Sequence, residues 1–165
     1  MSDTYVECLV NVPVSAGAKF AKTLLTVLTV ILAFLMFLGF WPAFFVGLAT
    51  GFGAYYVGLQ TDIEYEYLYL DRELVVDKVM AKTKRKRVAT YDLDRIEAFA
   101  PVKSYHLDNY KNRQCKTVYY TTKAEEKPDL RYVMYYEGNV KAYLSPSPEM
   151  VKAMRNVAPR KIFAD

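Results

Sequence analysis

The chain has 165 residues and a formal net charge of +4 at pH 7, so it is long enough for about one domain and too weakly basic to indicate nucleic-acid binding. Nearly all of the charge lies outside the first third, where the apolar residues are concentrated. The two cysteines, Cys8 and Cys115, lack the spacing of a disulfide framework or metal motif, and we expect both to be reduced thiols in the cytosol.

Residues 1–18 include TYVECLVNV (4–12), whose loose alternation predicts a strand that packs on the β-rich remainder of the chain rather than along a membrane surface. Lys19 and Lys22, followed by apolar residues, imitate a signal peptide. However, no small-x-small site ends that segment and a second apolar segment follows. We therefore expect the segment to remain on the mature protein.

The stretch from Thr23 to Thr61 contains 39 residues without Asp, Glu, Lys or Arg. As one helix it would be about 58 Å long, roughly twice the ~30 Å hydrocarbon core of a bilayer. The turn GFWP (39–42) divides it, because proline suits the first turn of a helix and tryptophan suits the membrane interface. We predict a transmembrane hairpin over 19–61, with helices at about 20–39 and 42–60. The rest of the chain is too short and polar to enclose both helices in a soluble core.

Basic residues flank only one end of this hairpin. Lys19 and Lys22 come just before the charge-free stretch that starts at Thr23, KTKRKR (82–87) follows the second helix, and the turn between the helices carries no charge. By the positive-inside tendency, both ends face the cytoplasm and only the turn reaches the other side. We therefore predict a multi-pass protein of the cell membrane with both termini in the cytoplasm.

Small residues line one face of the second helix, at Gly47, Gly51, Ala54 and Gly58. Small residues let helix backbones approach closely in lipid. We expect this face to receive the first helix of the same chain, with a homodimer seam as the alternative.

After Thr61 the pattern changes to a period of two, which is typical of half-buried strands. Short turns, including Gly138-Asn139, separate the segments. We predict seven strands, at 63–70, 73–80, 85–92, from Ile96 through 100–105, 115–122, 130–137 and 140–144.

The last predicted element is a helix over about 148–157, with Ser147 as its N-cap and Pro148 at its first position. Its apolar face would cover an open end of the strands, and closure would remove exposed sheet edges. The fold class is therefore a membrane α-helical hairpin followed, over 62–165, by a seven-stranded antiparallel β-barrel or sandwich closed by a C-terminal helix.

Seven strands and one closing helix are the order of the pleckstrin-homology superfold. The segment DRELVVDKVMAKTKRKRVATYDLDRIEAF resembles bacterial PH-like domains beside transmembrane helices, with corresponding positions at 71–72, 84–87 and 94–96. LSPSPEMVKAM resembles the proline-capped closing helix of that family. The resemblance covers 62–157 and implies short Gram-positive bacterial membrane proteins with two N-terminal transmembrane helices and a cytoplasmic PH-like domain.

Two departures from the family pattern are a polar insert at Tyr105–Gln114 and the absence of glycine at 80–82. The insert is either a recognition loop or a connector. The resemblance implies a fold and not a function, because one fold hosts many functions.

A basic segment is the candidate lipid-binding or partner-binding site. At about 1 kcal/mol per charge near an anionic surface, its five cations would contribute at most about 5 kcal/mol. A solvated strand edge and a protein or nucleic-acid partner are the competing interpretations. The segment consists of Lys82, Lys84, Arg85, Lys86 and Arg87.

Tyrosines are abundant on the predicted strands, where aromatic side chains favour a packed core and cross-strand pairs. A ligand groove or a membrane-interface belt is the alternative. These residues are Tyr65, Tyr67, Tyr69, Tyr119, Tyr120, Tyr132, Tyr135 and Tyr136.

Catalysis has little support. His106 is the single histidine and lies in the polar insert, where we expect an exposed loop position. A zinc site from His106, Asp108, Cys115 and Cys8 matches no ligand spacing. Glu64 and Glu66 share a strand face, but we do not expect them to act as an acid–base pair. We expect no enzyme activity, cofactor or metal.

The sequence thus predicts a membrane-anchored binding or scaffolding module that presents a PH-like domain to the cytoplasmic membrane surface. Its partners would be a protein, anionic lipid headgroups or a second copy, and not nucleic acid. The alternative is a small accessory subunit of a membrane transport or enzyme complex acting through the hairpin. That alternative is disfavoured because the polar groups of the spans are hydroxyls, which commonly bond to their own helix: Thr23, Thr26, Thr29 and Thr50.

Overall fold

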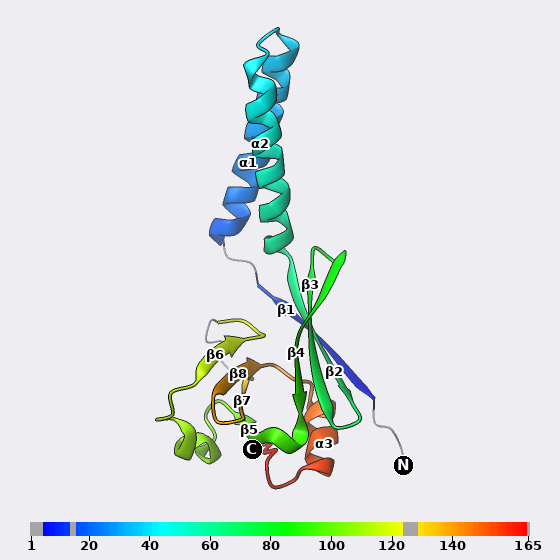
Figure 1. Ribbon diagram of the computed structural model, residues 1–165, viewed down its shortest axis with the longest axis vertical. Helices are drawn as coiled ribbons and strands as arrows, with labels where there is room; N and C mark the ends of the chain where they lie inside the picture. Colours follow the sequence, from blue (N-terminus) through cyan, green and yellow to red (C-terminus); the bar gives the residue numbers. More distant parts are fainter. Residues whose placement is uncertain (1–4, 14–15, 124–128, 165) are drawn as a thin grey trace. The chain divides into compact units, whose positions relative to one another are not determined.

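A computed structural model describes residues 5–13, 16–123 and 129–164 (Figure 1). The chain divides into two compact units. The helical unit comprises Pro13–Ile63 and Val79–Lys84, and the β unit comprises Met1–Val12, Glu64–Lys78 and Arg85–Asp165.

Two helices, α1 (Ala16–Phe37) and α2 (Pro42–Thr61), make up most of the helical unit. Pro42 opens α2 as expected, and Gly39 adopts a φ of 93° in the turn. The first helix begins four residues earlier than predicted. No residue of α1 is buried, and in α2 only Ala43 and Thr61 are buried. Both helices therefore present apolar side chains outwards, the pattern of helices surrounded by an apolar medium.

Small residues of α2 lie against α1. A Cβ atom at Gly47 would lie 3.4 Å from Leu32 Cβ, and one at Gly51 would lie 3.5 Å from Thr29 Cγ2. These glycines allow the two backbones to approach closely. The hairpin's own first helix therefore occupies this part of the small-residue face.

The β unit contains strands of two four-stranded sheets. The first sheet has the order β1-β2-β3-β4, formed by β1 (Val6–Val12), β2 (Ile63–Leu70), β3 (Glu73–Met80) and β4 (Lys84–Asp92). The second has the order β5-β7-β8-β6, formed by β5 (Ile96–Pro101), β6 (Lys116–Tyr119), β7 (Tyr132–Tyr136) and β8 (Val140–Leu144).

The prediction of a seven-stranded antiparallel barrel or sandwich holds only in part. The strands form two sheets and, among the described residues, no closed barrel. The segment before the hairpin contributes β1 to the first sheet. In addition, β6 pairs in parallel with β8, with Lys116 opposite Val140. The connection between these two strands includes all of β7, and parallel neighbours need such a long crossover.

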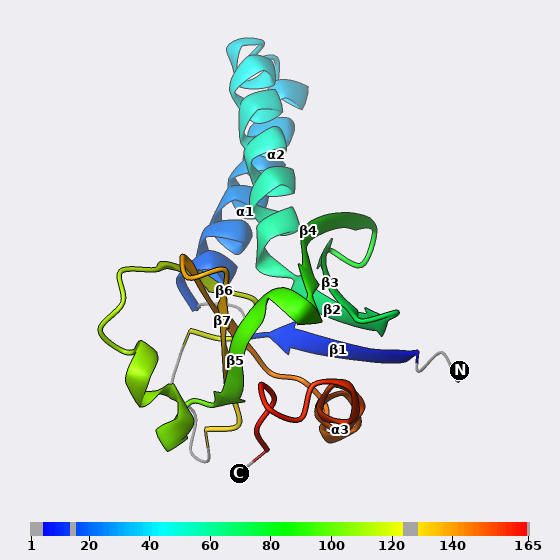
Figure 2. The same cartoon turned by 60° about the horizontal axis from the view of Figure 1, so that its bottom comes forward.

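Three short or closing elements complete the β unit: η1 (Leu93–Arg95), η2 (Tyr105–Tyr110) and α3 (Pro148–Val157). The side chain of Ser147 caps α3 by accepting a hydrogen bond from Met150 N at 3.2 Å. Figure 2 shows α3 beside β1, and the two elements are in contact. Met150 and Met154 point from α3 into the core and are fully buried, each stabilising the fold by about 1.5–3 kcal/mol.

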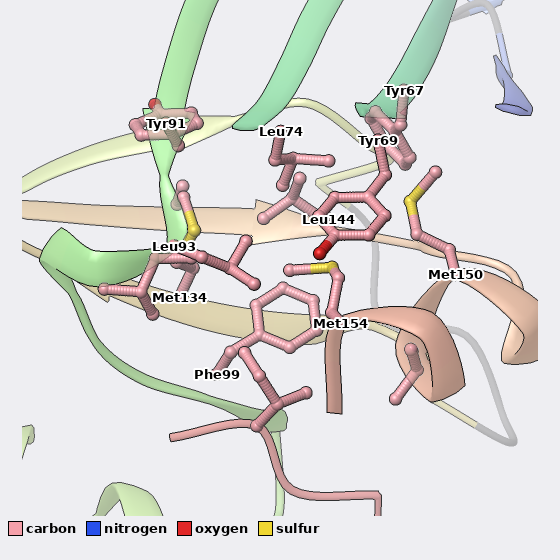
Figure 3. Close-up of a cluster of buried hydrophobic side chains, with 14 of the residues drawn as sticks. Tyr67, Tyr69, Leu74, Tyr91, Leu93, Phe99, Met134, Leu144, Met150 and Met154 are labelled. Atoms are coloured by element: carbon pink, nitrogen blue, oxygen red, sulfur yellow. The ribbon is translucent and has the colours of Figure 1, made fainter. Parts of the chain in front are cut away.

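Tyrosines fill much of the core between the sheets (Figure 3). Tyr67 donates a hydrogen bond to the carbonyl oxygen of Tyr120 at 2.7 Å, and the hydroxyls of Tyr91 and Tyr120 lie 2.7 Å apart. Burial raises the pKa of both Tyr67 and Tyr91. These tyrosines pack as core residues with their polar ends paired.

The polar insert at Tyr105–Gln114 is not a slack connector. It contains η2, in which Leu107 is buried, and Tyr110 stacks on Tyr135 of β7 with ring centroids 5.0 Å apart. Leu107 belongs to a second hydrophobic cluster with residues of β5 and β7. The insert therefore covers the outer face of the second sheet.

Candidate functional site

The predicted basic segment follows the turn between β3 and β4. Ala81 and Lys82 form this turn with positive φ angles of 49° and 54°, and Thr83 N donates to the Met80 carbonyl at 3.2 Å. Glycine usually occupies positions with this conformation. Because Ala81 and Lys82 occupy them here, the turn is mildly strained. The segment that follows, Lys84 to Arg87, is exposed.

The two arginines of the segment pair with buried carboxylates of the β unit. Arg85 Nη2 lies 2.6 Å from Glu66 Oε2, and Arg87 Nε lies 3.5 Å from Asp77 Oδ1. The side chains of Glu66 and Asp77 are only 3% and 7% exposed, whereas both arginines are more than half exposed. Within the described ranges those two oxygens accept no aligned hydrogen bond, so each pair is a close charge contact.

The pKa values of Glu66 and its neighbour Glu7 are both shifted. The pKa of Glu66 is raised, first by burial and then by its hydrogen bond with Glu7 of β1, while Arg85 opposes the shift. The pKa of Glu7 is lowered, chiefly by the same hydrogen bond. Glu66 is therefore the carboxyl that holds a proton more tightly, and Arg85 is the charge that favours its ionised form.

The lysines at the tip of the β3–β4 hairpin have a different environment. The tip belongs to the helical unit, in which Ala81 N donates to the carbonyl oxygen of Asp62 at 2.7 Å. Lys84 Nζ lies 5.8 Å from the ring centroid of Tyr55 on α2, a cation–π distance. Lys82 and Lys84 are thereby held at the end of α2.

Lys19 and Lys22 of α1 lie at the same end of the helical unit. They line one open groove together with Thr61 and Asp62, the residues at which α2 ends. The turn at the opposite end of the hairpin contains no charged residue. The helical unit thus gathers four lysines at one end: Lys19, Lys22, Lys82 and Lys84.

The five basic residues predicted as one site are therefore divided. The arginines neutralise buried acids of the β unit, and two of the lysines extend the basic end of the helical unit. Lys86 is exposed between the two arginines. Sequence reasoning overlooked the role of Glu66 and Asp77, although alternation on β2 places Glu66 opposite the core tyrosines.

The weak catalytic hypotheses find no supporting geometry. His106 is half-buried and its ring stacks on Phe163 at 3.7 Å, so the expectation of an exposed loop histidine is wrong. Among the residues that the structure describes, no three His, Cys, Asp or Glu side chains form a group able to hold a metal. Glu66 interacts with Glu7 rather than forming an acid–base pair with Glu64.

A pocket of about 380 Å³ on the β unit was not anticipated. Apolar walls come from Tyr132 of β7 and Val151 of α3, and Lys152 and Arg155 lie at its border. These residues are far apart in sequence, so no local pattern could have indicated the pocket.

The family model described as "Bacterial PH-like domain (DUF6106)" matches residues 2–164. The match includes the helical hairpin and the β unit, and it confirms the resemblance drawn from the sequence. No curated protein and no solved structure matches the chain.

Proposed function

The chain belongs to the bacterial PH-like domain family, and from this premise we propose that it is a non-catalytic, membrane-anchored binding module. Its helical hairpin spans the cell membrane, both termini face the cytoplasm, and the β unit is presented at the inner membrane surface. There it contacts anionic lipid headgroups or a protein partner.

The outward-facing apolar surface of α1 and α2 supports insertion. The helices contain 22 and 20 residues, which corresponds to about 33 and 30 Å, the thickness of the hydrocarbon core. Large side chains such as Phe34 (65% exposed) and Phe45 (73% exposed) project outwards. The Thr29 and Thr50 hydroxyls bond to each other at 3.1 Å inside the hairpin, so polar groups are paired where the medium is apolar.

The single observation that carries the orientation is the gathering of four lysines at one end of the helical unit. Two of them lie in the first two turns of α1, and two are held there by the hydrogen-bonded tip of the β3–β4 hairpin. At about 1 kcal/mol each near an anionic leaflet, they would contribute up to about 4 kcal/mol. The paired arginines Arg85 and Arg87 are left out of this sum because their charges are already balanced by Glu66 and Asp77.

The orientation is tested with full-length chains carrying a C-terminal reporter that is active either only inside or only outside the cell. We expect the wild type to be active only with the inside reporter. Replacing all four lysines by glutamine should raise the outside signal, because the charge asymmetry that sets topology is removed. Arg85→Gln with Arg87→Gln is the matched control and should leave the orientation unchanged. An outside signal from the wild type would refute the proposal.

The pocket on the β unit favours a protein partner as a second mode of contact. Leu130 is 73% exposed at its border and Lys152 supplies a cation, so an acidic segment with an apolar anchor would complement it. Leu130→Asp with Lys152→Glu should abolish crosslinking to such a partner in native membranes. Unchanged crosslinking in that variant would exclude the pocket as the contact surface.

A further inference from the structure

An open groove of about 640 Å³ lies at the basic end of the helical unit. One wall comes from α1 and the other from the end of α2. Its polar lining includes Lys19, Lys22, Thr23, Thr26 and Asp62, and Val27 adds an exposed apolar side chain. The groove therefore combines two cations with neutral and acidic oxygen atoms beside an apolar surface.

The Lys22 side chain packs against α2 at Gly58, which presents no side chain of its own. A Cβ atom at Gly58 would lie 3.5 Å from Lys22 Cε and 3.9 Å from its Nζ, with no other side-chain atom of the described residues so near. Gly58 thus differs from Gly47 and Gly51, which face apolar or methyl groups of α1. It makes room for a cation.

The depth of Lys22 in a bilayer calls for an anionic partner. Lys22 is 15 residues from the end of α1 at Phe37, which is about 22 Å and less than the ~30 Å hydrocarbon thickness. Its ammonium must therefore extend towards the headgroups. Neither Lys19 nor Lys22 forms an ion pair with another described residue.

The hydroxyls of the groove act as acceptors. Thr23 Oγ1 donates its proton to the Lys19 carbonyl at 3.0 Å, and Thr26 Oγ1 donates to the Lys22 carbonyl at 2.8 Å. Each hydroxyl has one proton, so both oxygens can only accept a further bond. The exposed Asp62 carboxylate is another acceptor. A complementary ligand must carry an anion for the lysines and hydrogen-bond donors for these oxygens.

We propose that the groove binds the headgroup of an anionic phospholipid that carries free hydroxyls. The phosphodiester pairs with the ammonium groups of Lys19 and Lys22, the headgroup hydroxyls donate to the acceptor oxygens, and an acyl chain lies along Val27. The inference rests on the proposed function, because the hairpin must lie in a bilayer for this groove to meet a lipid.

The test uses the full-length chain in detergent and native mass spectrometry of retained lipid. The probes are phosphatidylglycerol, phosphatidylmethanol (a phosphodiester without hydroxyls), phosphatidylcholine and water-soluble glycerol phosphate. We expect retention to fall in the order phosphatidylglycerol, phosphatidylmethanol, phosphatidylcholine, with about tenfold between the first and the last. Equal retention of the three lipids, or equal binding of glycerol phosphate, would overturn the proposal.

Two variants locate the site. Lys22→Gln should reduce phosphatidylglycerol retention about tenfold. Gly58→Leu should do the same with all charges intact, because the leucine occupies the path of the Lys22 stem. Lys116→Gln is the matched control, because Lys116 is an exposed lysine of β6 outside the groove, and this variant should retain the lipid. Wild-type retention in the Lys22 and Gly58 variants, or an equal loss in the control, contradicts the assignment.

Near-UV circular dichroism of the tyrosines, together with α-helical content in the far UV, checks that each variant is folded.

Failure of this inference is distinguishable from failure of the proposed function. If carbonate extracts the chain from membranes, the proposal of a membrane-anchored module is refuted. A chain that stays membrane-integral and correctly oriented, but shows no preference among the lipids, refutes only the headgroup groove.

Discussion

Replacing Arg85 by glutamine should destabilise the β unit in a pH-dependent way. Arg85 lies 2.6 Å from the carboxylate of Glu66, whose side chain is 3% exposed. Without Arg85 that carboxylate keeps its burial and loses its counter-charge. Removing one partner of a fully buried ion pair costs about 3–5 kcal/mol. Because Arg85 itself is 59% exposed and water can take its place, we expect a smaller loss of about 1–3 kcal/mol near neutral pH.

The sign of the pH dependence follows from the raised pKa of Glu66. The folded chain holds the Glu66 proton more tightly than the unfolded chain. Ionisation of Glu66 therefore lowers the free energy of unfolding as pH rises from the ordinary pKa of the group, about 4.3, through its higher pKa in the folded chain. Arg85 lowers the folded pKa, and its removal extends that window upwards. The deficit of the variant should therefore be small near about pH 4 and reach its full size above the window.

The assay is urea unfolding of the full-length chain in detergent, followed by the near-UV circular dichroism of the core tyrosines at several pH values. Lys86→Gln is the matched control, because Lys86 is exposed on the same strand and its loss should change stability by less than about 0.5 kcal/mol. Adding Glu66→Gln to the Arg85 variant should recover much of the loss at neutral pH. A pH-independent deficit, or one equal to that of the control, would refute the reasoning.

Three further variants test the core, the closing helix and the strained turn by the same unfolding assay. Tyr120→Phe leaves the buried hydroxyl of Tyr91 without its 2.7 Å partner and should cost about 1–2 kcal/mol; wild-type stability would show that the hydroxyl pair contributes nothing. Ser147→Ala removes the acceptor for Met150 N and should cost about 1 kcal/mol, whereas a loss below measurement error would contradict its role as a cap. Ala81→Gly relieves a positive φ of 49° and should stabilise the hairpin by about 0.5–1 kcal/mol; destabilisation would contradict the inferred strain.

Local patterns were sufficient for several elements. Alternation predicted strands at 63–70 and 73–80, which coincide with β2 and β3, and the Ser147-Pro148 cap predicted a helix at 148–157, which coincides with α3. In each case the signal and the structure occupy the same few residues. The turn before β8 was less well located: Glu137 and Gly138 have the positive φ angles, one residue earlier than predicted.

Non-local pairing could not be predicted in the same way. Nothing in the sequence of β6 indicates that it skips its neighbour β7 and pairs with β8, and β1 joins β2 across the whole helical hairpin. The strand predicted to run from Ile96 to Tyr105 ends at Pro101, because the chain then turns into η2 and packs on β7. Strand pairing of this kind is determined by packing between segments that are distant in sequence.

The candidate site shows the same limit. Five positive charges are visible in the sequence at 82–87, but whether each charge is available depends on carboxylates contributed by other strands. Glu66 lies on β2 and Asp77 on β3 of the same sheet as the basic strand β4. Acids at positions that alternate with the core residues of those strands were the signal that could have revealed the pairing. Counting charge along one strand overestimated the basic surface because it ignored its neighbours.

The orientation of the chain in a membrane is the central claim, and protease protection tests it most directly. Full-length protein is produced in bacterial cells, and sealed vesicles of either orientation are treated with protease and probed for the β unit. We predict that carbonate does not extract the chain, that protease digests the β unit in inside-out vesicles, and that right-side-out vesicles protect it. Digestion in right-side-out vesicles, or release of the chain by carbonate, would contradict the account.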